Sequence, residues 1–228
     1  MDLRTLEKSS LFRGMSESEI ESALDMVSYH VEHYEKDDTI LRAMDDADRI
    51  GVILSGRAQA QKTFPNGSQV NVAVRMPGDM IGPATAFSAM AKYPCDVVAM
   101  DTVTVLFFRK SDLLRLMGEC ASIMQNFTRQ LATAAFMLQQ RLELFSYSGI
   151  AQKAAFSLLM YERQTGKTAF PIPDSITKWA MQMNVSRPSL HRELKKLEAD
   201  GIIRYAPPVV EIIDRDALQD VLSQIRRS

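Results

Sequence analysis

The stretch Asn184-Val185-Ser186-Arg187-Pro188-Ser189-Leu190-His191-Arg192-Glu193-Leu194 decides how the C-terminal part of the chain folds. Asn184 tolerates the left-handed backbone of a tight turn. Ser186 is a good N-cap for a helix over residues 187–199, because its side chain can accept a bond from a free N–H of the first turn. Pro188 fits that first turn, where its missing N–H costs nothing. The stretch therefore predicts a tight turn that leads into a helix.

The sequence on both sides of this stretch completes the prediction. A shorter helix over 176–182 comes first, and Asp174-Ser175 can cap it. Gly201 ends the second helix as the residue that follows the cap. Two strands, over 202–205 and 209–213, come next and are joined by Ala206-Pro207-Pro208. We expect a helix-turn-helix with a β wing.

The outward face of the second helix is basic and polar, which is typical of a helix that enters the major groove of DNA with its N-terminus first. Arginine there can make two hydrogen bonds to guanine, and serines at a helix N-terminus suit phosphates. An ordinary solvated basic face is the alternative, and the cap, turn and wing favour DNA. The candidate DNA-binding residues are Ser175, Ser186, Arg187, Pro188, Ser189, His191, Arg192, Lys195 and Lys196.

Charge is distributed unevenly along the 228 residues, although 27 Lys and Arg against 28 Asp and Glu leave a net charge of only −1. Residues 150–228 hold 12 basic and 9 acidic residues, a net of +3, and residues 1–149 carry −4. Two modules with different partners would explain this asymmetry. The chain shows no signal peptide and no apolar run near the ~20 residues of a membrane span, so we expect a cytoplasmic protein with no membrane partner.

The N-terminal half alternates apolar and polar residues with the period of β-strands. Strand-like segments lie near 29–34, 39–42, 50–54, 57–63, 69–75, 95–99 and 103–109. Asn66-Gly67 is a strong hairpin signal. A short helix after Ser16 precedes them, because Ser16 and Glu19 have capping-box spacing. Many short strands without long intervening helices predict a sandwich or barrel.

The pattern becomes helical from Ser111 to Phe145, where two apolar or small positions recur every seven residues over four heptads. One helix of about 35 residues would span roughly 50 Å, too long for one small sandwich to cover. A parallel coiled coil between two copies is favoured over a helix buried against its own β domain. The predicted interface comprises Met117, Ala121, Met124, Thr128, Leu131, Ala135, Leu138, Leu142 and Phe145.

Nearly the whole chain resembles the Crp/Fnr family, the cyclic-AMP receptor protein and its relatives. The resemblance rests on residues 184–194 quoted above, Leu11-Phe12-Arg13-Gly14-Met15, Ile50-Gly51-Val52-Ile53-Leu54-Ser55-Gly56 and Pro77-Gly78-Asp79-Met80-Ile81-Gly82. It implies an α+β protein: an N-terminal β-roll (jelly-roll) effector domain of cyclic-nucleotide-binding type, a long coiled-coil dimerisation helix and a C-terminal winged helix-turn-helix. The expected boundaries are 1–110, 111–145, a hinge at 146–149, and 150–228.

The chain departs from the family pattern where relatives bind their cofactors. Members that bind cyclic AMP carry a Glu and an Arg-Ser pair at positions that correspond here to Pro83, Tyr93 and Pro94. The cysteine cluster of the iron–sulfur branch is also missing. On the recognition helix Pro188 replaces the common Glu, whereas Arg187 and Arg192 match the family's DNA-contacting arginines.

We therefore expect an effector that is neither cyclic AMP nor an iron–sulfur cluster. A less polar ligand fits the apolar helix residues, and haem is one candidate for it. The predicted effector pocket comprises Met80, Ile81, Gly82, Pro83, Ala84, Tyr93, Pro94, Phe127, Leu131, Ala134 and Leu138.

These expectations describe a homodimeric transcriptional regulator that binds palindromic double-stranded DNA, acts with RNA polymerase and responds to a small-molecule effector. A haem- or redox-based sensor of gases or nitrosative stress, or a metabolite-binding module, is the alternative. An enzyme with a cupin-like barrel is not expected, because clustered His and Glu ligands are absent. We expect no catalytic residues and no metal site.

Overall fold

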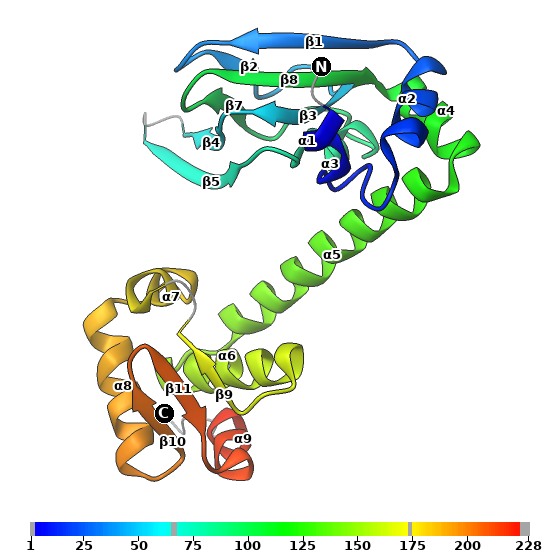
Figure 1. Ribbon diagram of the computed structural model, residues 1–228. Coiled ribbons are helices and arrows are strands. Elements are labelled where there is room, and N and C mark those ends of the chain that lie inside the picture. Colours follow the sequence, from blue (N-terminus) through cyan, green and yellow to red (C-terminus); the bar gives the residue numbers. More distant parts are fainter. Residues whose placement is uncertain (1–2, 65–67, 173–174, 224–228) are drawn as a thin grey trace. The chain divides into compact units, whose positions relative to one another are not determined.

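The computed structural model describes residues 3–64, 68–172 and 175–223. Its chain divides into two compact units, residues 1–134 and 135–228, with the boundary inside a helix (Figure 1). Each unit has a hydrophobic core of its own. The hairpin signal at Asn66-Gly67 and the cap residue Asp174 involve positions outside the described residues.

The first unit is built on two four-stranded antiparallel sheets. One sheet has the order β1-β8-β3-β6, with bounds Tyr29–Tyr34, Val103–Arg109, Arg49–Ser55 and Met80–Ile81. The other has the order β2-β7-β4-β5, with bounds Thr39–Leu41, Asp96–Ala99, Ala58–Thr63 and Gln69–Arg75. The strands expected from period-two alternation are thereby confirmed, and β6 is an additional short strand that pairs with β3.

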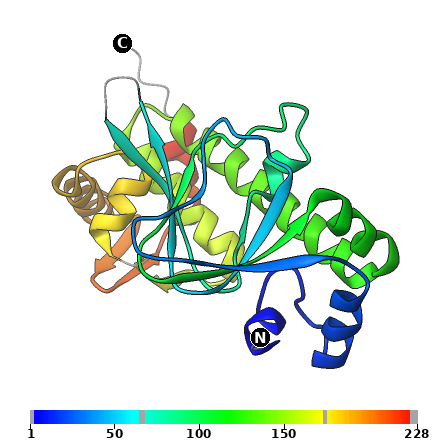
Figure 2. The same ribbon diagram turned by 90° about the horizontal axis from the view of Figure 1, so that it is seen from above.

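In its described part, the first unit also contains four short helices. They are α1 (Leu3–Glu7), α2 (Glu17–Asp25), α3 (Pro83–Ala86) and α4 (Lys110–Glu119). The helices α2 and α4 lie at one end of the sheets (Figures 1 and 2), and α1 packs against α2 and β3. The expected capping box of α2 is confirmed, because Ser16 accepts from the N–H of Glu19 and its own N–H donates to the Glu19 carboxylate at 2.8 Å. Ile20 and Leu24 of α2 reach the core.

The continuous helix expected over 111–145 is wrong in one respect, because it breaks at Cys120. That residue is extended, with φ −124° and ψ 102°, and it separates α4 from α5 (Ala121–Ser146). Gly118, two residues earlier, lowers the local helix propensity by about 1 kcal/mol. The break lets two separate faces pack into one core, Leu113 and Leu116 from α4 and Ile123 and Phe127 from α5. The heptad pattern of the sequence continues through residue 120, so it does not reveal that the helix changes direction there.

The second unit contains the predicted winged helix-turn-helix. Its elements are α6 (Ile150–Thr165), β9 (Ala169–Pro171), α7 (Ile176–Gln182), α8 (Arg187–Ala199), β10 (Ile203–Ala206), β11 (Val209–Ile212) and α9 (Arg215–Ser223). The strands form a sheet of order β10-β11-β9, so β9 adds a strand to the expected wing, and α9 packs against α6. In the described part of the chain, no helix is long and apolar enough to cross a membrane.

Buried contacts fix the two helices of the motif. Trp179 of α7 is buried, and its indole N–H donates to the Ser157 hydroxyl of α6 at 2.7 Å. Leu190, Leu194 and Leu197 of α8 form the predicted inward stripe and are buried in the same core. Since the apolar side of α8 is held in this way, its opposite side must face outward.

Candidate nucleic-acid interface and ligand pocket

The turn between α7 and α8 has the expected geometry. Asn184 has a φ of +54°, in the left-handed region, and Gly201 after α8 has a φ of +75°. The hydroxyl of Ser186 accepts from the N–H of Ser189 at 3.2 Å, which caps α8. Such a cap contributes about 1 kcal/mol. Ser175 caps α7 in the same way by accepting from the N–H of Lys178.

The exposed face of α8 brings the predicted DNA-binding side chains together. The exposed residues of this face are Ser186, Arg187, Pro188, His191, Arg192, Lys195 and Lys196, and Ser189 is half-buried. A hollow of about 440 Å³ separates the start of α8 from the wing, with Arg187 and Pro188 on one side and Tyr205 and Pro207 on the other. The side chains of this face are therefore accessible to a partner.

The cations of this face differ in their surroundings. Lys195 pairs with Glu198 at 2.7 Å, and Lys196 pairs with Glu193 at 2.9 Å. Among the described residues, Arg187 and Arg192 have no ion pair or hydrogen bond of their side chains. The N–H groups of the two arginines near the start of α8 are therefore free to donate to a phosphate or to guanine.

Tyr205 of the wing contacts α8 through two residues. Its hydroxyl lies 3.1 Å from His191 Nδ1, and the Lys195 ammonium lies 5.3 Å from the centre of its ring. Burial raises the pKa of the Tyr205 phenol, and the nearby Lys195 and Arg187 act in the opposite direction. The sequence predicted the wing, but it did not predict that a wing tyrosine holds a side chain of the recognition face.

The first unit contains a pocket of about 230 Å³ between its strands, α3 and α5. Nine of the predicted pocket residues line it, namely Met80, Ile81, Gly82, Pro83, Ala84, Tyr93, Pro94, Leu131 and Ala134. Two do not: Phe127 is buried against Phe87, and Leu138 is 60% exposed and lies beyond the first unit. Helical spacing could not separate these positions from Leu131 and Ala134, because the break at Cys120 sets which face of α5 meets the core.

Other pocket residues were not predicted. They are Leu41, Ala60, Arg75, Thr85, Cys95, Val97 and Gln130. Arg75, Cys95 and Gln130 come from three elements or loops far apart in the sequence, so no local pattern could have assembled them. Burial, followed by the charge of Asp96, raises the pKa of the Cys95 thiol, and Arg75 and Lys62 oppose this shift.

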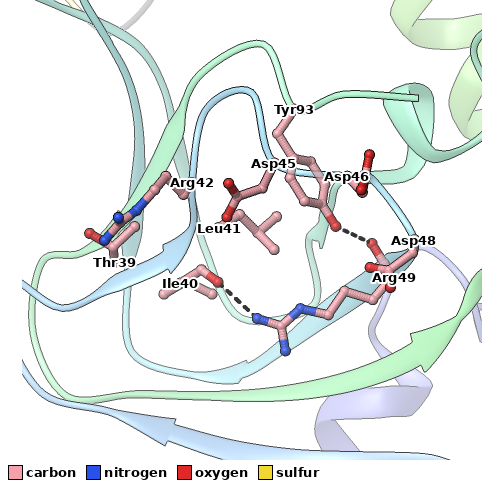
Figure 3. A pocket seen from close by; sticks show the side chains of 9 residues that line it. All are labelled: Thr39, Ile40, Leu41, Arg42, Asp45, Asp46, Asp48, Arg49 and Tyr93. Carbon is pink, nitrogen blue, oxygen red and sulfur yellow. Dashed lines mark hydrogen bonds between the residues drawn. The ribbon is translucent and has the colours of Figure 1, made fainter. Parts of the chain in front are cut away.

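Tyr93 separates this pocket from a more polar hollow of about 350 Å³ beside the loop 42–48 (Figure 3). Its hydroxyl donates to the carbonyl of Arg49 at 2.8 Å, as Figure 3 shows, so its proton is not available to a ligand. Asp45, Asp46 and Asp48 line the polar hollow, and Asp46 pairs with Lys92 at 2.6 Å. In the described ranges, no three His, Cys, Asp or Glu side chains are placed to hold a metal ion.

Some residues of the predicted dimer interface are partly buried within the first unit, and the others are exposed. Met117 and Leu131 are partly buried against the core of the first unit. Met124, Leu138, Leu142 and Phe145 expose 52%, 60%, 64% and 46% of their surface along α5. Ala121, Thr128 and Ala135 are exposed on the same helix. An apolar stripe therefore remains uncovered on α5, but it is shorter than predicted.

Comparisons with known proteins agree with both units. Residues 31–120 match the cyclic nucleotide-binding domain, and residues 152–221 match the Crp-like helix-turn-helix domain. The cyclic AMP receptor protein of Thermus thermophilus is 24% identical over 216 residues, which cover 95% of this chain and 98% of that protein.

Two solved structures share the fold. The catabolite activator protein of Thermus thermophilus has a TM-score of 0.56 at 23% identity, and the match covers 94% of this chain and 99% of that one. A CooA mutant from Carboxydothermus hydrogenoformans also has a TM-score of 0.56, at 14% identity, with 96% and 95% covered. With a cyclic nucleotide-binding domain followed by a Crp-like helix-turn-helix domain, this chain belongs to the Crp/Fnr family of transcriptional regulators.

Proposed function

We propose that the chain is a sequence-specific DNA-binding regulator whose two-fold symmetric dimer binds a palindromic operator under the control of a small-molecule effector. The observation that carries the proposal is the exposed start of α8, where Arg187 and Arg192 are unpaired among the described residues. A helix positioned in this way by a wing and a capped N-terminus suits the major groove. The proposed site of action is the cytoplasm, with RNA polymerase as a partner and without catalysis.

Selection of operator DNA from a random-sequence pool tests this function. We expect an enriched two-fold symmetric sequence with half-sites about one helical turn, ~34 Å, apart. Binding should weaken steeply with salt, because phosphate contacts release counterions. A pool with no enriched sequence would contradict the proposal. Enrichment of a single asymmetric half-site would contradict only the dimer.

The dimer is proposed to form along the exposed apolar stripe of α5, from Met124 through Leu138 and Leu142 to Phe145. Monomeric soluble proteins rarely expose a large contiguous apolar patch. The heptad spacing of these positions suits a parallel pair of helices. A second copy of the same helix would cover the stripe and would give the operator its symmetry.

We further propose that the effector is not cyclic AMP. The positions that would meet its phosphate hold Tyr93, whose hydroxyl already donates to Arg49, and Pro94, which has no N–H. Pro83 stands where a Glu would meet the ribose, so Arg75 could meet the phosphate but the ribose hydroxyls would be buried without their partner, which is unfavourable. Calorimetry with millimolar cyclic AMP tests this point, and saturable binding with a Kd below about 10 μM, roughly −7 kcal/mol, would contradict it.

The haem alternative has a spectroscopic test. Haem iron takes axial ligands such as His, Cys or Met, and the described residues of the pocket include Met80 and Cys95 but no His. Absorption of the purified protein in the Soret region, lost in a Cys95→Ser or Met80→Leu variant, would support haem. A protein that retains no Soret absorption after incubation with haemin and removal of the unbound haemin would exclude this alternative.

A further inference from the structure

Arg75 is the last residue of the edge strand β5 (Gln69–Arg75), and its side chain lies on the inner face of the sheet. In the β4–β5 ladder Arg75 is directly opposite Ala58, and Ala73 is opposite Ala60. Directly opposite residues of an antiparallel pair point to the same side of the sheet. Ala58 and Ala60 are both buried, whereas Val74, which points the other way, is 48% exposed. The guanidinium of Arg75 therefore faces the pocket.

This cation has no counterpart among the described residues. No hydrogen bond or ion pair of its side chain is present there, although seven other ion pairs are. The lining residues described for the pocket include no Asp or Glu. A half-buried cation that lines a pocket without an anion is less favourable than one whose charge a ligand neutralises. The wall of this pocket thus carries a positive charge that the other described lining residues do not neutralise.

Gln130 provides a second unsatisfied group in the same pocket. Its side-chain oxygen is buried and has no hydrogen-bond partner. Buried polar atoms in native proteins are almost always paired, and an exception points to a missing ligand or water. The amide can both donate and accept. Arg75 from β5 and the N–H group of Gln130 from α5 can therefore donate to an anionic occupant, and the Gln130 oxygen can accept from a water or a hydroxyl beside it.

The rest of the wall is apolar or already engaged. Ala60, Met80, Ile81, Val97, Leu131 and Ala134 supply the apolar surface. The Tyr93 hydroxyl donates to Arg49, and the Thr85 hydroxyl donates to the carbonyl of Gly82 at 3.2 Å. The volume of about 230 Å³ is below the ~300–1,000 Å³ of pockets for drug-sized ligands. The occupant must be small and largely apolar.

We infer that the effector is a small organic acid with an apolar body, whose carboxylate accepts hydrogen bonds from Arg75 and from the Gln130 N–H group while its body packs against the apolar wall. The inference deepens the proposed effector control and rests on it. A guanidinium forms two parallel charge-assisted hydrogen bonds with a carboxylate, as it does with a phosphate, and the small apolar pocket favours a compact carboxylic acid. The several hydroxyls of a nucleoside would find one free acceptor, the Gln130 oxygen, and no carboxylate among the described lining residues, so the wall selects against a sugar.

A matched series of ligands tests the inference on the unaltered full-length protein. Calorimetry or ligand-observed NMR is run with butyrate, hexanoate, octanoate, benzoate and phenylacetate. Hexanamide and phenylacetamide are the uncharged counterparts. We expect at least one acid to bind saturably and its amide to bind about 10- to 100-fold more weakly, the range for one lost hydrogen bond to a charged group. Equal binding of acid and amide, or no saturable binding of any acid up to 10 mM, would overturn the inference.

Variants locate the binding site. Arg75→Gln should weaken the best acid at least 10-fold, Arg75→Lys should retain part of the affinity, and Gln130→Leu should cost several-fold. Arg109→Gln, an exposed arginine at the end of β8, is the matched control and should have no effect. Circular dichroism checks that each variant folds. Unchanged affinity in Arg75→Gln would overturn the assignment.

The operator assay separates this inference from the proposed function. If no acid binds but the protein still selects a two-fold symmetric DNA sequence, the acid inference is wrong and the regulator remains. If an acid binds through Arg75 and no DNA sequence is enriched, the pocket is correct and the DNA-binding proposal is wrong. If both hold, we expect the acid to change operator affinity, because a ligand shifts an equilibrium by its differential affinity for two states.

Discussion

His191 of the recognition helix and Tyr205 of the wing are joined by a contact of 3.1 Å between Nδ1 and the phenol hydroxyl, and their rings meet edge to face with centroids 5.4 Å apart. The wing is thereby tied to a side chain of the candidate DNA-binding face. Arg187 and Lys195 both lie near the same tyrosine. The wing therefore helps to orient this face as well as to complete the core.

Removal of that hydroxyl tests the orientation. Tyr205→Phe keeps the ring contact and loses the hydrogen bond, so we expect unfolding free energy to fall by only about 1 kcal/mol. The preferred operator sequence should change at the base that His191 faces. Denaturation in urea and repeated operator selection measure the two effects, with Tyr161→Phe on α6 as the control. An unchanged consensus would show that His191 does not depend on the wing.

Because Asn184 has a left-handed backbone, we expect substitutions there to lower stability by different amounts. Asn184→Gly should leave stability nearly unchanged, because glycine adopts a φ of +54° without strain. Asn184→Val should cost about 1–3 kcal/mol, since a β-branched residue is strained in that region. Thermal or urea unfolding measures both variants. Equal stability of the two would mean that the turn relaxes to another conformation.

The cations of α8 should contribute unequally to DNA binding. Arg187→Ala should cost roughly 1–3 kcal/mol and relax base preference, as the loss of one bidentate contact would. Lys195→Ala should weaken all sequences uniformly and by less, because Lys195 is paired with Glu198 in the free protein. Binding assays on the selected operator and on mismatched sites at fixed salt distinguish the two. Unaltered affinity and consensus in Arg187→Ala would refute α8 as the recognition helix.

The uncovered stripe of α5 predicts where a charge disrupts the dimer. Leu142→Glu should give monomers in light scattering, because burying an unpaired charge in an interface costs several kcal/mol. Gln139→Glu, at an exposed position of the same helix, is the control and should remain dimeric. Leu131→Glu is less informative than the heptad pattern suggests, since Leu131 also lines the pocket. A dimeric Leu142→Glu would place the interface elsewhere.

We expect the rate at which Cys95 is alkylated to depend on pH. Burial raises its pKa, so the reactive thiolate forms at higher pH than in a free cysteine, and alkylation at pH 7 should be slow. Arg75 opposes this shift, so Arg75→Gln should move the midpoint of the rate profile to still higher pH. Iodoacetamide kinetics in a Cys120→Ser background, against the Cys95→Ser, Cys120→Ser double variant, measure it. A midpoint at or below that of free cysteine would contradict this account.

The sequence by itself determined the winged helix-turn-helix and the order of most strands. These features rest on local interactions: the Ser186 cap, the left-handed Asn184, Gly201 after α8, and two clear hydrophobic periods. Each is decided within a few residues, so each can be recognised without the rest of the fold. The candidate DNA-binding residues followed from the same helix face.

Only the tertiary structure decided the break at Cys120, the half-burial of Met117 and Leu131, and the polar groups of the pocket. Arg75 resembles any strand arginine in the sequence, and its inward position depends on the register of β5 against β4. Gln130 resembles any solvated helix residue until α5 packs against the sheets. Contacts between segments so far apart in the chain have no periodic signature, because packing and register, rather than local propensity, bring them together.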